Sequence, residues 1–210
     1  IIRLHPMVIM GSIVGASLFY FQQSSCFPQI EHTSVGALLL IMLLGCTLLP
    51  LPLKWDVRGW TEMHPLNGPA WSLYYEYIAN ILYALFIRRF NKIALTVLVV
   101  IAACFTVYRS LTAPMGDMVG GWALNWEQQY VGFVRLMYPF FGGLLLSRLG
   151  WLIRIKKRAF WYCALIIIVI LSIPRLGGEE HYWMNGLYES FCIIFIFPII
   201  VSMGAGGKVT

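Results

Sequence analysis

The sequence predicts an all-α protein, a polytopic bundle of transmembrane helices, and three observations lead to that prediction. Hydrophobic residues make up 60% of the 210 residues and charged residues only 11%, whereas a soluble domain averages about 45–50% and about 25%. The mean hydropathy is +0.76. The apolar residues also gather in long runs, several of which approach the roughly 20 residues that a helix needs to cross a bilayer. The runs span residues 6–21, 34–53, 69–87, 93–111, 131–147, 159–174 and 187–204.

The first two runs are compatible with two membrane topologies. The second run ends in "LPLPL" at residues 49–53, and prolines break helices. If Arg3 is cytoplasmic, 34–53 must enter and leave on one side as a re-entrant or interfacial segment; if Arg3 is external, it spans. We favour the first topology. The first run also contains "GSIVG" at residues 11–15, a GxxxG pattern that predicts close helix packing.

The third run carries a carboxylate where lipid is expected. Ser72, Glu76 and Asn80 are spaced i, i+4 and i+8, with Tyr83 at i+11, so a helix places all four on one stripe. A charge at the membrane centre costs at least about 2.5–3.5 kcal/mol and normally faces a protein interior or a wet cavity. A functional pocket is the favoured reading of Glu76, and a purely structural role is the alternative.

The later runs share a direction that brings further charges to one level. Basic residues follow the third run (Arg88, Arg89, Lys92) and the fifth (Arg148, Arg154, Lys156, Lys157, Arg158), and such clusters mark the cytoplasmic side. Runs 69–87, 131–147 and 187–204 then all travel inward. Glu76, Arg135 and Glu189 should therefore lie at similar depth, in one polar pocket. Alternatively, Arg135 snorkels to the surface and Glu189 is interfacial.

Several other classes of function are not indicated. The net charge of +6 follows the cytoplasmic loops, so we expect no nucleic-acid partner. The five cysteines lie far apart and predict neither disulfides nor a zinc site. No histidine has HExxH spacing, so no metal is expected. Because both ends of the sequence enter apolar runs almost at once, we expect an internal part of a larger membrane protein.

One stretch resembles a known family. Trp71-Ser72-Leu73 followed by Glu76 resembles the WSL-x-x-E segment of the acyltransferase 3 family of integral-membrane O-acyltransferases. "IIRLHP", "RLMYPFFGGLLLSRL" and "YESFCIIFIFPIIVSMGAG" are similar to further family segments, in the same order. Residues 1–210 are accordingly expected to be a partial acyltransferase 3 membrane domain, with about six to seven apolar helices and truncated at both ends.

The resemblance implies transfer of an acyl group, often acetyl from acetyl-CoA, to a hydroxyl of a glycan or other surface molecule. In the family the leading candidate for the reactive group is a histidine of the first helix, which precedes this chain, so the fragment alone is expected to be inactive. The roles that we assign are hypotheses: catalytic, Glu76 and Arg135; substrate-binding, Trp71, Ser72, Asn80, Tyr83 and Glu189; acyl-CoA-binding, Arg3 and His5. No bound cofactor is expected beyond acyl-CoA as co-substrate.

Two other functions stay open at this point. A transporter or flippase component for a polar or glycan substrate also lines its path with polar helix stripes, and a purely structural membrane subunit is a third possibility. Dependence on acyl-CoA separates the first reading from the others. The expected location is a bacterial inner (plasma) membrane, crossed several times.

Overall fold

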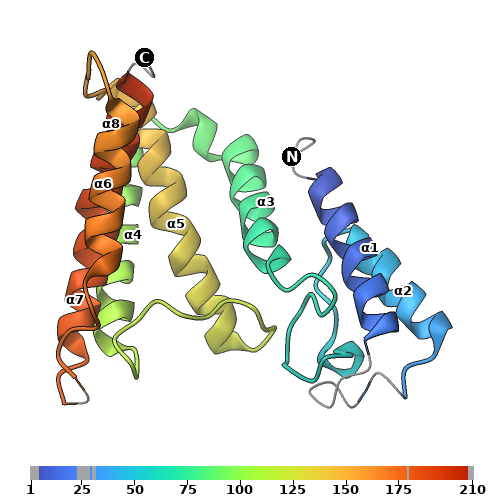
Figure 1. Ribbon diagram of the computed structural model, residues 1–210. Helices are drawn as coiled ribbons and strands as arrows, with labels where there is room; N and C mark the ends of the chain where they lie inside the picture. Colours follow the sequence, from blue (N-terminus) through green and yellow to red (C-terminus); the bar gives the residue numbers. More distant parts are fainter. Residues whose placement is uncertain (1–4, 23–28, 30–31, 179, 208–210) are drawn as a thin grey trace. The chain divides into compact units, whose positions relative to one another are not determined.

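The computed structural model describes residues 5–22, 29, 32–178 and 180–207, and every regular element in them is a helix (Figure 1). This confirms the all-α prediction. The chain divides into two compact units. Unit 1 comprises Ile1–Leu85 and Gly120–Phe133, and unit 2 comprises Phe86–Val119 and Val134–Thr210. Each unit is described separately.

Unit 1 begins with a pair of packed helices, α1 (His5–Phe21) and α2 (Val35–Cys46). Ser34 caps α2, since its hydroxyl accepts a hydrogen bond from the amide of Ala37. A core of buried apolar side chains joins the two helices to the loop that follows. Its buried members are Ala16, Phe19, Leu38, Ile41, Leu51, Val57 and Leu66.

The chain turns back after α2. The helix has 12 residues, so it is about 18 Å long and shorter than the roughly 30 Å hydrocarbon core. Leu48 then adopts a positive φ of 62°, and the chain continues through the short 3₁₀ helix η2 (Leu53–Trp55). Gly59 lies against the side chain of Gln29, in the α1–α2 connection. The path returns to the end at which α2 began, while the re-entrant position of 34–53 in a membrane stays a prediction.

The GxxxG pattern packs closely, but the partner is not a helix. A Cβ on Gly15 would collide with the backbone carbonyl of Leu66, and one on Gly11 would collide with the side chain of Asn67. Both partners belong to the loop that leads into α3. The prediction of helix packing at 11–15 is therefore corrected: the glycines let a folded loop lie directly on α1.

The last parts of unit 1 are α3 (Ala70–Leu85) and the beginning of α5 (Trp126–Leu149). Tyr75 of α3 is 1% exposed and lies against Gly132 of α5, where any Cβ would overlap its ring. Its ring also meets Phe133 edge-on, with centroids 5.3 Å apart. Glycine at 132 is thus required by the tyrosine.

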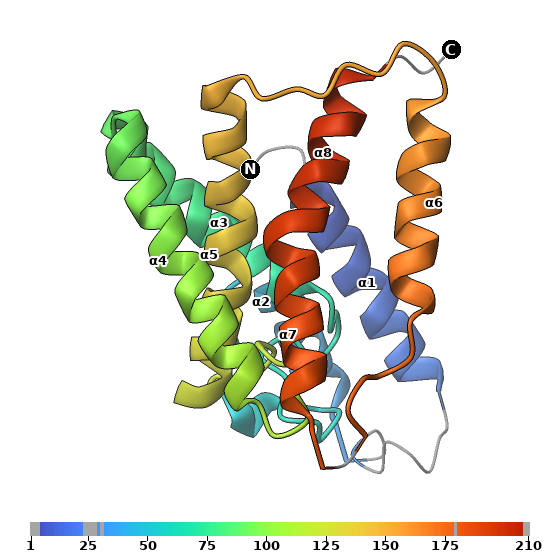
Figure 2. The same cartoon turned by 90° about the vertical axis from the view of Figure 1, so that its left-hand side faces the viewer.

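Unit 2 contains the long helices (Figures 1 and 2). After the 3₁₀ turn η3 (Ile87–Arg89) come α4 (Lys92–Thr112), the rest of α5 and α6 (Ala159–Ser172). The last rod runs without a break through α7 (Trp183–Phe191), the π-helical turn η4 (Cys192–Ile196) and α8 (Phe197–Gly206). Three helices, Lys92–Thr112, Trp126–Leu149 and Trp183–Gly206, are long and apolar enough to cross a membrane.

The predicted basic clusters meet at one end of unit 2. The Arg148 guanidinium at the end of α5 donates to the carbonyls of Phe90, Ile87 and Arg88, the bond to Ile87 being 3.3 Å long. At the same end Ile153 pairs with Ser202 of α8. As the two clusters were expected to share a side, this contact agrees with the parity argument made from the sequence.

Prolines remove one backbone hydrogen bond from each of two long helices. Pro139 lies inside α5 and lacks the N–H that would pair with the carbonyl of Arg135 in a regular helix. Pro198 withholds the same bond from Ile194, and the Tyr138 hydroxyl donates to that carbonyl over 2.8 Å. Hence α5 and the η4–α8 rod are fastened together where both are irregular. π-turns of this kind are often found at functional sites.

Candidate functional site

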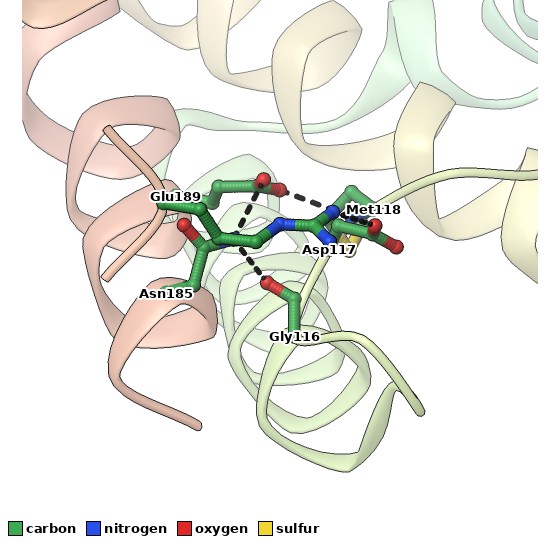
Figure 3. Close-up of polar contacts among 6 residues, drawn as sticks. Gly116, Asp117, Met118, Asn185 and Glu189 are labelled. Carbon is green, nitrogen blue, oxygen red and sulfur yellow. Dashed lines mark hydrogen bonds and ion pairs between the residues drawn. The ribbon is translucent and has the colours of Figure 1, made fainter. Parts of the chain in front are cut away.

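A polar cluster lies inside unit 2, and Glu189 of α7 is its centre (Figure 3). Glu189 uses both carboxylate oxygens: Oε2 accepts from the amide of Met118 at 3.0 Å, and Oε1 accepts from Asn185 Nδ2 at 3.2 Å. Asn185 also donates to the carbonyl of Gly116 at 2.7 Å. The pair therefore fixes the loop after α4 onto α7 by bonds across the unit.

The shape of this loop depends on Gly116. Its φ is +61°, and a Cβ would strike the carbonyl of Tyr182, so only glycine fits without strain. Next to it, Asp117 forms a 2.7 Å ion pair with Arg175. The loop is thus held from both sides, by Arg175 before α7 and by Glu189 within it.

Arg135 of α5 belongs to the same cluster. It is half-buried and lies close enough to Glu189 for the two charges to stabilise each other. The carboxylate thus offsets the cost of holding a guanidinium among apolar helices. Arg135 and Glu189 lie within electrostatic reach of each other in unit 2. One polar pocket shared by Glu76, Arg135 and Glu189 stays a prediction, because Glu76 belongs to unit 1.

Arg135 also lines a cavity of about 350 Å³, called the α5 cavity below. This is within the size range of ligand pockets, about 300–1,000 Å³. Its walls come from α4, the loop after it, α5 and the η4–α8 rod. Besides Arg135, the walls include Thr106, Met118, Tyr138, Gly143 and Phe197. The lining is mainly apolar, so Arg135 is its one charged side chain among the described residues.

In unit 1 the polar stripe of α3 exists as predicted. The Ser72 hydroxyl donates to the carbonyl of Pro69 at 2.9 Å, and Asn80 Nδ2 donates to the carbonyl of Glu76 at 2.8 Å. Both side chains thus satisfy the backbone of their own helix, whereas the Glu76 carboxylate has no hydrogen-bond or ion-pair partner among the described residues of unit 1. Tyr83 is half-buried one turn further on. The stripe therefore offers a carboxylate that no described residue of unit 1 binds.

The aromatic residues around this stripe were only partly predicted. Trp71 meets Tyr75 edge-on, with centroids 6.1 Å apart, and its ring borders Gly121. His5 Nδ1 lies 3.0 Å from the hydroxyl of Tyr77, which joins the start of α1 to α3 one residue after Glu76. Arg3, the other residue expected to bind acyl-CoA, lies outside the described residues.

Sequence reasoning missed His64, in the loop before α3. Its side chain is 3% exposed, and both ring nitrogens lack a hydrogen-bond partner among the described residues. The ring lies near Tyr74, with centroids 6.2 Å apart, and lines a small cavity with Ser12 and Asn67. Burial lowers the pKa of His64 from 6.5 to about 4, so the ring is neutral at physiological pH.

The remaining titratable groups near these residues form an ion pair but no metal site within the described part of the chain. No cluster of three or more metal-ligating side chains occurs among the described residues. In the same loop as His64, burial raises the pKa of Glu62 and its 3.0 Å ion pair with Arg58 partly offsets that effect. The polar groups available for chemistry are therefore carboxylate, guanidinium, imidazole and phenol.

Comparison with known proteins agrees with the resemblance read from the sequence. A family model described as an acyltransferase domain matches residues 2–209, nearly the whole chain. No curated protein and no solved structure shows significant similarity to the chain.

Proposed function

The chain belongs to the acyltransferase 3 family, and from that membership we propose that it transfers an acyl group from acyl-CoA to a hydroxyl of a glycan or other surface molecule. That it is a membrane acyltransferase follows from the family and the apolar helices. Four points are proposals: the acyl-CoA donor, the glycan acceptor, acetyl as the first acyl group to test, and a bacterial inner membrane as the location.

One observation supports this proposal more than any other. A guanidinium, with a carboxylate beside it, lies on the wall of a ligand-sized cavity among apolar helices. In acyl transfer the acceptor oxygen attacks the thioester carbonyl, the C–O bond forms, and negative charge develops on the carbonyl oxygen. The C–S bond then breaks, the electron pair leaves on the CoA sulfur, and the proton that the base takes from the acceptor hydroxyl passes to that sulfur. A half-buried guanidinium among apolar helices supplies donors for that oxyanion.

We assign the acceptor to α3. The Glu76 carboxylate would orient the acceptor hydroxyl or the histidine that the family supplies as base. Trp71, Ser72, Asn80 and Tyr83 would shape this side, the indole by stacking on a sugar. Glu189 would act on the donor side through Arg135. His5 and Arg3 would bind the CoA moiety at the start of α1.

The test is acyl transfer by membranes that contain the full-length protein, with labelled acetyl-CoA and longer acyl-CoAs as donors. We expect Arg135→Gln to lower transfer by about 100-fold or more, as removal of an oxyanion donor does, with the protein still folded. Arg109→Gln in α4 is the matched control, because Arg109 lies outside the α5 cavity, and it should keep transfer within about twofold. A protein that acts without acyl-CoA would be a transporter, and the proposal would be wrong.

A further inference from the structure

We infer that the α5 cavity is the binding site for a hydrophobic acyl chain longer than acetyl, held with its carbonyl at Arg135. The inference rests on the proposed function and narrows its donor. An acetyl group brings one methyl group to such a site, whereas the cavity measures about 350 Å³. That is roughly the volume of a dozen water molecules in the liquid.

The shape of the cavity matches a chain. Its α5 wall is formed by residues 134, 135, 138, 139, 142, 143 and 146, which follow one face of the helix. From Arg135 to Leu146 this face is about 16 Å long. Arg135 stands near one end and the lining beyond it is apolar, with Phe197 and Ile193 opposite. An apolar space with donors near one end of its α5 wall suits a molecule with an apolar tail and a polar head.

The charges of Arg135 and Glu189 favour a ligand whose polar end is uncharged. Since Glu189 already offsets the charge of Arg135, the pair as a whole is close to neutral. A neutral oxygen, such as a thioester carbonyl, can accept hydrogen bonds there without adding a net charge to the low-dielectric interior. A phosphate would bring at least one uncompensated charge, whose burial is costly. The acyl donor fits better than the head of an anionic lipid.

Two glycines of α5 keep the space open. A Cβ on Gly143 would meet nothing within 4 Å, and one on Gly142 would meet only the Tyr138 ring, at 3.7 Å. Glycine inside a helix costs about 0.5–1 kcal/mol relative to alanine, and packing within unit 2 does not require it at either position. Both glycines line the cavity, so their effect is to leave room for a ligand.

The first experiment compares acetyl-, butyryl-, hexanoyl- and octanoyl-CoA as donors for the full-length protein. The wild type should use hexanoyl-CoA at least as efficiently as acetyl-CoA. Gly143→Leu should lower the ratio of kcat/KM for hexanoyl-CoA to kcat/KM for acetyl-CoA by about tenfold or more relative to the wild type. Gly204→Leu in α8 is the control, because it too has open space and lies outside the lining; it should leave the order of donors unchanged.

A second readout is independent of turnover and of any folding defect in Gly143→Leu. A diazirine-bearing hexanoyl-CoA should label peptides around Gly143 and Phe197 in the wild type, and Gly143→Ala should reduce that labelling.

The outcomes separate the two claims. Transfer of acetyl alone, with no effect of Gly143→Leu, would overturn the acyl-chain site and leave the proposed function intact. Equal labelling by a diazirine phosphatidylcholine would also overturn it, since the cavity would then be a groove filled by membrane lipid. If no acyl-CoA of any length is consumed or bound, the proposed function itself fails.

Discussion

The two units treat their buried polar groups in opposite ways. In unit 2 Glu189 and Asn185 use their polar atoms in bonds that hold the loop after α4. In unit 1, Asp56, His64 and Tyr75 each carry a buried atom without a hydrogen-bond partner among the described residues. The described residues of unit 2 contain no such atom.

This difference separates polar groups that stabilise from polar groups available to a ligand. An unpaired buried polar atom costs about 1–3 kcal/mol, and native proteins carry few of them. Two of these residues lie at α3, the helix that also carries Glu76: Tyr75 belongs to it, and the His64 ring lies near Tyr74. We therefore expect substitution of Glu189 or Asn185 to affect mainly folding, and substitutions along α3 to affect mainly activity.

The largest effect on stability should follow from Glu189→Leu. It would leave the Met118 amide and Asn185 Nδ2 without their charged acceptor, so we expect a loss of about 3–5 kcal/mol, since a hydrogen bond to a charged group contributes about 1.5–3 kcal/mol. Thermal unfolding of the purified protein in detergent measures it. Glu180→Leu, at an exposed loop position, should change stability by no more than about 0.5 kcal/mol. Equal stability of the two variants would contradict the role given to Glu189.

The next largest effect should be a pH dependence from His64. The unfolded chain binds a proton near pH 6.5 and the folded chain only near pH 4, so the unfolded state binds more protons between these values. Stability should therefore fall as the pH drops from 6.5 to 4, by about 3 kcal/mol at about 1.4 kcal/mol per pH unit. The measurement is the unfolding midpoint across this pH range.

His64→Phe should flatten this part of the pH profile. His181→Phe is the matched control, because the side chain of His181 is exposed, and it should leave the slope as in the wild type. A wild-type profile that is level between pH 4 and 6.5 would show that His64 is not buried neutral.

Much of the fold could be predicted because its causes are local. Seven apolar runs became seven helical rods close to their expected limits, and "LPLPL" ended the second one early. The shared direction of two runs was enough to bring Arg135 and Glu189 together. The GxxxG pattern showed that something packs closely on α1, but a pattern of small residues does not say whether the partner is a helix or a loop.

The rest of the site depends on contacts between distant residues. The bonds from Asn185 and Glu189 to residues 116 and 118 close a separation of about seventy positions, which no periodicity reveals. The i, i+4 spacing of Asn185 and Glu189 was a signal that could have been used. His64 was missed because a loop histidine is usually solvated, and only the packing of this loop in unit 1 buries it.

Glu76→Gln in the full-length protein tests the comparison most directly, with acyl transfer and thermal stability measured on the same preparation. We expect transfer to be lost while stability changes by less than about 1 kcal/mol, because the carboxylate has no partner among the described residues of unit 1 and is assigned to the reaction. Full activity of this variant, or loss of the folded protein with it, would contradict the assignment of α3 to the reaction.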